Sequence, residues 1–265
     1  MNIDVTKSIG NVEEHLIQDE NAQIDIHIHS GVKSTLLIRF EEKVRKAKIS
    51  IQIDEKASLL FLVLQPNINE GAHVHITHEC IVSDSSEINC MSLLFNGNTT
   101  YELVSNIKGS NSTSNIDVIS YANAESDQHI SIKNIFNSNN GKGDINVRSI
   151  AQNKAKIKCD GDVHISSNGD GTCANLLEEI LLLDKECRAK AVPMLHIYSN
   201  SVTSSHSASV TKIPEDDYFT FASRGIEEKE AKRMYAEGFL CQGICDMPKN
   251  TKELLLDQVR MNICI

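Results

Sequence analysis

A short β-type phrase recurs about every ten to fourteen residues between about 22 and 166, and it constrains the fold more than any other feature. Examples are "QIDIHIHS", "AKISIQID", "AHVHITHE" and "GDINVRSI". In each phrase apolar and polar residues alternate, and β-branched side chains are frequent. This period of two predicts strands, with the Ile side chains on one face and the polar side chains on the other.

The turns between these phrases are rich in Asn, Ser, Gly and Asp, as in "GSNSTSN" and "NSNNGKGD". Two architectures fit this spacing: an antiparallel sandwich and a parallel β-helix whose coils stack. Asn-Gly and Asp-Gly hairpin dipeptides are few, and the corners resemble those of a solenoid. We therefore predict a mainly β fold, a right-handed parallel β-helix body with a C-terminal α-helical segment. The expected parts are an N-terminal segment (1–20), the β-helix core (21–214) and a helical region (215–265).

Charge and hydropathy narrow the classes of partner. The chain has 36 acidic and 26 basic residues, a formal charge of −10, which disfavours nucleic acid and anionic membrane surfaces. The first twenty residues lack an apolar stretch behind a basic start, and no later run reaches the length of a membrane span. We therefore expect a cytoplasmic protein.

The histidines and cysteines invite a metal interpretation, since His-x-His on a strand places both imidazoles on one face. In "IDIHIH" and "AHVHIT", however, the histidines alternate with Ile and Val, which favours solvent-facing strand positions. The histidines of this region are His27, His29, His73, His75 and His78. The eight cysteines are irregularly spaced and indicate free thiols. Cys241 and Cys245 would share a helical face, and we interpret them as packing residues.

Helical patterns dominate the last third of the chain. Propensity alone predicts a helix over 173–190, "CANLLEEILLLDKECRAK". An acidic turn and an aromatic strand are expected near "PEDDYFTF". Two amphipathic helices then follow, one in "IEEKEAKRMYAEGFL" and one after Pro248 with Asn250 as its cap. Such a tail either folds back on the body or offers its apolar face to a partner.

The segment from 180 to 240 resembles the C-terminal core of the SufB/SufD family of iron–sulfur cluster assembly proteins. Its motifs are an "LL" stretch, a proline before an extended strand, an "SH-x-A" element, an acidic turn, "RGI-x-E-x-x-A" and a terminal "GF". The matching residues are Pro193, Leu195, Ile197, His206, Ala208, Ile213, Glu215, Phe219, Arg224, Gly225, Ile226, Glu228, Ala231, Gly238 and Phe239. The match is ordered and ungapped.

The resemblance implies a parallel β-helix followed by helices, and a scaffold that is not itself an enzyme. Family members form dimers that bind a SufC-type ABC ATPase, which hydrolyses the ATP, and receive sulfur from a cysteine desulfurase. On this basis we expect a transient iron–sulfur cluster, of the 4Fe–4S type. The chain is short beside the many family members that carry a long helical N-terminal domain, and we expect a minimal version that forms a homodimer or a SufB/SufD-type heterodimer. Residues 215–265 are the expected ATPase-binding region.

The resemblance also implies cluster ligands. His206 matches the family histidine that faces the other protomer, and Cys187 falls where SufB-type members carry a cysteine. Glu178 occupies the position of the essential SufB-type cysteine, and Ser207 that of a candidate glutamate ligand, so the chain is closer to SufD. We expect Cys187, His206 and either Glu178 or Glu179 from each protomer to meet across a dimer interface, with Cys173 in reserve.

Two other functions compete with this one. A SufD-like subunit could hold the ATPase and a SufB-like partner without ligating iron. A β-helix enzyme acting on polysaccharides would need clustered carboxylates beside aromatic platforms. The chain has no Trp and only 5% aromatic residues, which disfavours the enzyme.

Overall fold

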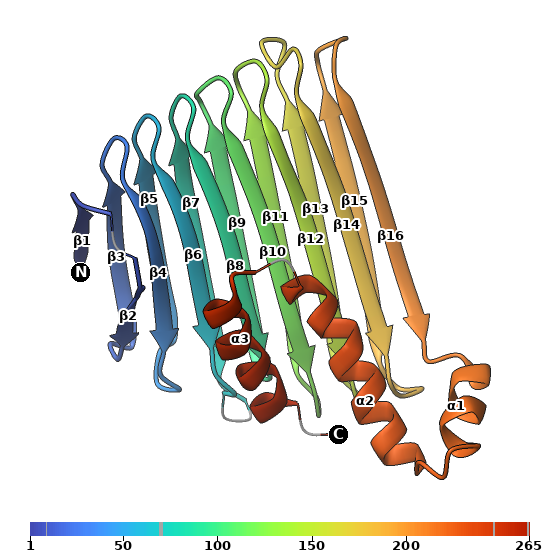
Figure 1. Ribbon diagram of the computed structural model, residues 1–265. Helices are drawn as coiled ribbons and strands as arrows, with labels where there is room; N and C mark the ends of the chain where they lie inside the picture. Colours follow the sequence, from blue (N-terminus) through green and yellow to red (C-terminus); the bar gives the residue numbers. More distant parts are fainter. Residues whose placement is uncertain (9, 69–70, 246, 264) are drawn as a thin grey trace.

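The computed structural model describes residues 1–8, 10–68, 71–245, 247–263 and 265. Two eight-stranded sheets face each other, and successive strands of the chain alternate between them (Figure 1). The odd sheet consists of β1 (Asn2–Val5), β3 (Asn21–Ile28), β5 (Lys46–Ile53), β7 (His73–Val82), β9 (Asn98–Ile107), β11 (Asp127–Phe136), β13 (Lys156–Ile165) and β15 (Arg188–Ile197). The even sheet consists of β2 (Val12–Ile17), β4 (Lys33–Phe40), β6 (Ser58–Gln65), β8 (Glu87–Phe95), β10 (Thr113–Ala122), β12 (Lys142–Ala151), β14 (Cys173–Leu182) and β16 (Thr203–Lys212).

Every strand pairs in parallel with the strand one coil away. Thr113 of β10, for example, pairs with Lys142 of β12, and Gln128 of β11 pairs with Thr99 of β9. Parallel pairing of strands that alternate between two sheets makes a solenoid, which confirms the predicted β-helix and excludes the antiparallel sandwich. β1 and β2, in the predicted N-terminal segment, join the two sheets as their first strands.

The interior of the solenoid is built from the apolar phase of each strand. Ladders such as Ile26, Ile51 and Cys80 run from coil to coil on the inward face. His78 takes the ladder position after Ile49 and is 1% exposed. Burial lowers the pKa of His78 to about 3, so its imidazole is neutral. His78 therefore differs from the other histidines of this region, which lie in the opposite phase.

The corners repeat as regularly as the strands. One corner of each coil has a residue with positive φ, and the residue's N–H donates to a carbonyl of the next coil, as Asn111 does to Asn139 at 3.1 Å. These corner residues are Gly31, Lys56, Ser85, Asn111, Asn140 and Gly171. Asn and Gly tolerate this backbone conformation well, which explains the polar, Asn-rich turns. The Asn140 amide also donates to the Asn111 side chain at 3.1 Å.

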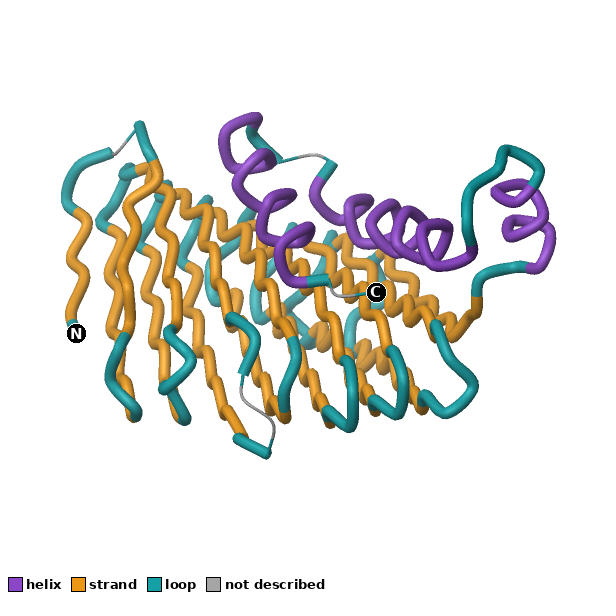
Figure 2. The backbone as a smooth tube through the Cα atoms, turned by 90° about the horizontal axis from the view of Figure 1, so that it is seen from below, coloured by secondary structure: helices purple, strands orange, loops and turns teal. Residues whose placement is uncertain are grey.

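The C-terminal segment contains α1 (Glu215–Ala222), α2 (Glu228–Cys241), the 3-10 turn η1 (Gln242–Ile244) and α3 (Lys249–Asn262). α2, η1 and α3 lie on the outer face of the even sheet (Figure 2). Their buried residues, which include Leu240, Leu255 and Val259, form a second apolar cluster with Leu93 and Tyr121 of that sheet. The tail therefore folds back on the body. Within the described residues, no helix is both long and apolar enough to cross a membrane.

Three local predictions were wrong. Residues 173–190 form β14, a corner and the start of β15 instead of a helix, because stacking on β12 and β13 outweighs the helical propensity of Leu and Glu. Residues 215–222 form α1 instead of an acidic turn and an aromatic strand. Asn250 lies inside the first turn of α3, whose N-cap is Pro248.

Candidate functional site

The solenoid ends in a coil whose two strands lack a neighbour on one side among the described residues. β15 is the last strand of the odd sheet and β16 the last of the even sheet. Most of β16 is exposed, including Val210 at 45%, and Ile197 of β15 is 40% exposed. An unpaired strand edge presents free N–H and C=O groups that can pair with another chain. We call this coil, residues 188–212, the open end.

His206 lies at the open end, on the inward phase of β16. It pairs with Leu176, whose side chain is buried in the solenoid, but no strand of the described residues stacks over His206, and it is exposed. The flanking hydroxyls are anchored to β14: Ser204 donates to the Ala174 carbonyl and Ser205 to the Asn175 side chain, both at 2.7 Å. Because these side chains are short and bonded to β14, they do not block access to the imidazole.

Glu178 lies one coil deeper on the same inward phase, two residues beyond the partner of His206. It is fully buried, and neither carboxylate oxygen has a hydrogen-bond partner of good geometry among the described residues. A Cβ atom on Gly161 would lie 2.9 Å from Glu178 Oε1 and 2.5 Å from Leu176 Cδ1, so the glycine leaves space for the carboxyl group. Burial raises the pKa of Glu178 to about 7, and the adjacent backbone of Gly161 offsets only part of that rise.

Cys159 faces the same interior from β13. Its thiol is fully buried and lies 3.9 Å from Ser149 Oγ. Burial raises the pKa of the Cys159 thiol, and the charge of Glu178 raises it further, so the thiol is protonated. Cys159 was not predicted as a site residue, although the alternation of "KAKIKC" places it on the same phase as Ile157.

The other proposed ligands lie elsewhere. Cys187 is 8% exposed in the corner after β14, where its thiol donates to the Asn153 carbonyl at 3.3 Å. Burial raises the pKa of the Cys187 thiol. Glu179 points to the outer face of the even sheet and pairs with Arg148 at 3.0 Å. Cys173 is exposed at the start of β14.

The strand length separates these groups. Cys173 and Cys187 lie at opposite ends of β14, about 30 Å apart at the usual rise per residue. His206 is level with Leu176, about 20 Å along the strand from the corner of Cys187. One chain therefore brings His206 and Glu178 into the same region, with Cys159 beside it, but does not bring Cys173, Cys187 or Glu179 there.

The donors at the open end suit a soft or borderline metal. Imidazole and carboxylate bind iron more weakly than thiolate, and weak ligands suit a cluster that is passed on. Such a cluster would be cargo of the protein. Fold and site together describe a β-solenoid with a helical tail and a candidate metal-binding open end.

Comparison with known proteins gives the family. Residues 5–239 match the family model described as "SUF system FeS cluster assembly, SufBD core domain". The chain is 30% identical over 122 residues to iron-sulfur cluster assembly SufBD family proteins of Staphylococcus epidermidis and Staphylococcus haemolyticus. The aligned region covers 46% of this chain and 26% of each relative. The chain belongs to the SufBD family of iron–sulfur cluster assembly proteins.

Proposed function

We propose that this protein is a non-catalytic scaffold subunit of a cytoplasmic SUF-type system, on which an iron–sulfur cluster of the 4Fe–4S type is transiently assembled. The observation that carries the proposal is the pairing of His206 with Leu176 at the open end, one coil above the buried Glu178. A second chain that stacked on this coil would cover His206 and place it inside the interface.

A second chain would complete this site. β16 has ten residues without a proline and carries a single lysine, so it has few of the features that block edge pairing. Antiparallel pairing of β16 with the equivalent strand of a homodimer or a SufB/SufD-type heterodimer would bring two copies of the inward phase together. The partner would also supply the thiolates that His206 lacks nearby within its own chain.

The tail is the proposed contact for a SufC-type ATPase, which would hydrolyse the ATP. The apolar faces of α2 and α3 are already buried against the even sheet. α1 has no buried residue, and its Phe219 is 75% exposed. We therefore assign the ATPase contact within residues 215–265 first to α1. Sulfur would come from a cysteine desulfurase.

The test is anaerobic reconstitution with iron and sulfide, with iron measured per chain. We expect His206→Ala to lose most of the bound iron and of the visible charge-transfer absorption. His196→Ala is the matched control, because His196 is an exposed histidine on the outward phase of β15. Equal iron contents in the two variants would remove His206 from the site. A colourless wild-type protein that still retains the ATPase would identify the non-ligating SufD-like subunit.

A further inference from the structure

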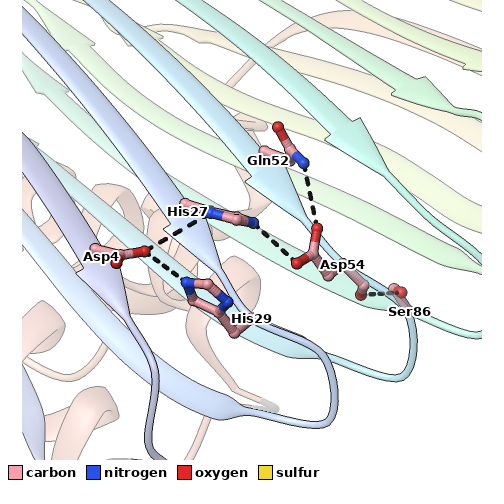
Figure 3. A network of polar contacts seen from close by, with 6 residues as sticks. All are labelled: Asp4, His27, His29, Gln52, Asp54 and Ser86. Atoms are coloured by element: carbon pink, nitrogen blue, oxygen red, sulfur yellow. Dashed lines mark hydrogen bonds and ion pairs between the residues drawn. The ribbon is translucent and has the colours of Figure 1, made fainter.

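The opposite end of the solenoid carries a second group of metal-type donors. Asp4 of β1 pairs in register with His27 of β3, and His29 follows two residues later on the same face. One donor atom from each of these three residues lies within 4.8 Å of the others. Figure 3 shows the two imidazoles converging on the Asp4 carboxylate.

The hydrogen bonds around His27 determine which of its ring nitrogens is available to bind a metal. His27 Nε2 lies 2.9 Å from Asp54 Oδ2, and an ionised carboxylate only accepts, so Nε2 donates. The lone pair of a neutral His27 is then on Nδ1, which lies 3.6 Å from Asp4 Oδ1. With a neutral His27, two acceptors face each other across this distance, an arrangement that a cation bound between them stabilises.

The spacing also fits an ion. Zn²⁺ binds nitrogen and oxygen ligands at about 2.1 Å, which places two tetrahedral ligands about 3.4 Å apart. The 3.6 Å between His27 and Asp4 matches that separation. His29 Nε2 lies 2.7 Å from Asp4 Oδ1, a hydrogen-bond distance, so His29 needs only a small shift to become the third ligand.

A supporting shell holds His27 in place. Asp54 accepts from Gln52 at 3.2 Å, and its backbone carbonyl accepts from Ser86 at 2.7 Å (Figure 3). The Asp54 N–H donates to the Ile28 carbonyl at 3.0 Å. A carboxylate behind a ligating histidine is the usual outer-shell arrangement of zinc sites.

We propose that Asp4, His27 and His29 form a binding site for one divalent transition-metal ion, with Zn²⁺ as the ion that fits the donors best. Asp54 is the positioning residue for His27. A groove of about 510 Å³ on the outer face of the odd sheet is lined by Asp4, His27 and Gln52, so the fourth coordination position is open to water. The site lies six strand spacings from β15, about 29 Å from the open end. It is therefore independent of the proposed cluster.

The chain contains its own control. His73 and His75 of β7 repeat the His-x-His pattern on the odd sheet, but they contact Thr100 and Glu102 and belong to no three-donor group in the described part of the chain. Metal-free protein in which the exposed Cys173 and Cys245 are replaced by serine would be titrated with Zn²⁺ by calorimetry and with Co²⁺ by absorption.

We expect one ion per chain and a Co²⁺ spectrum without thiolate charge transfer. Asp4→Asn and His29→Ala should each weaken binding at least tenfold, and Asp54→Asn about 10- to 100-fold. The double variant His73→Ala/His75→Ala should bind as the parent does. Absence of binding by the parent, or equal affinities in all variants, would overturn the proposal. Iron reconstitution at the open end should be unchanged in His29→Ala, which separates this test from that of the proposed function.

Discussion

The two ends of the solenoid differ in how deeply their inward-facing apolar side chains are buried. At the first coil, β1 is only four residues long, yet Ile3 and Val5 are 6% and 4% exposed. At the last coil, β15 and β16 each have ten residues, and Ile197 and Val210 are 40% and 45% exposed. The long, uncovered strands β15 and β16 are the last of the solenoid (Figure 1), and β16 carries His206.

The first coil therefore closes one end of the apolar interior, whereas the last coil leaves its inward residues exposed. On the inward phase of β16, Ser204, His206 and Ala208 precede Val210, and at the His206 position the inner coils carry Leu176, Ile145 and Ile116. The polar residues reduce the apolar surface that this uncovered coil exposes to water. We therefore expect the open end to be stable without a partner.

The largest effect is expected from a matched pair of isoleucines in the terminal strands of the odd sheet. Ile3→Ala should lower the free energy of unfolding by about 2–5 kcal/mol, because Ile3 is buried. Ile197→Ala should cost under about 1 kcal/mol in the monomer, because Ile197 is already half in solvent. Urea unfolding of both variants measures the difference. Equal decreases in the free energy of unfolding would show that the two ends bury their inward residues equally.

A second effect concerns the carboxyl group below the open end. The unfolded chain releases the Glu178 proton near pH 4.5, whereas the folded chain keeps it up to about pH 7. Stability from this group is therefore fully present below pH 4.5 and is lost as the pH rises to 7, by up to about 3 kcal/mol.

Glu178→Gln removes that loss. In iron-free protein, the free energy of unfolding of the variant should exceed that of the wild type more at pH 8 than at pH 5, as measured by urea unfolding at both values. A difference that does not change with pH would mean that the carboxyl group is solvated.

A third effect concerns pairing at the open end. Val210→Lys places a charge on the inward phase of the edge strand and should weaken self-association at least tenfold, or about 1.4 kcal/mol. The control is Ile81→Lys, at a residue of β7 that is 37% exposed and far from the edge. Sedimentation equilibrium distinguishes them, and an unchanged dimer in Val210→Lys would place the interface elsewhere.

The smallest effect is expected at Glu179, which we expect, unlike Glu178, to have no role in iron binding. Glu179→Gln weakens a half-buried ion pair with Arg148, and because the amide oxygen of the introduced glutamine can still accept from the guanidinium, it should cost about 1 kcal/mol. Bound iron after anaerobic reconstitution should stay at the wild-type level, because Glu179 faces away from the open end. Loss of iron in this variant would contradict the assignment of Glu178 to the site.

The solenoid could be predicted because its signal is local and repeated. Alternation along the strands recurs from coil to coil, and the corners are rich in polar residues and Gly, so one misread strand does not change the predicted fold. The segment 173–190 failed because its Leu and Glu residues favour a helix locally, while its strand state comes from pairing with β12 and β13, about thirty residues earlier.

The site was only partly predictable. The motif around His206 could be read from the sequence, but the burial of Glu178 depends on Gly161 of another strand, and the inward phase of Cys159 gains meaning only beside Glu178. The site of Asp4, His27 and His29 could not be predicted from the spacing of the histidines alone. Asp4 is more than twenty residues from them in the sequence and lies beside them only because β1 pairs with β3.

The central claim is that two open ends meet around a cluster. Sedimentation velocity of anaerobically reconstituted protein, followed at the visible thiolate-to-iron absorption, tests it most directly. The account predicts that the colour sediments with the mass of two chains and that Val210→Lys, at the same protein concentration, lowers both the dimer fraction and the colour. Colour that sediments with a single chain, or a dimer that persists in Val210→Lys with its iron intact, would contradict it.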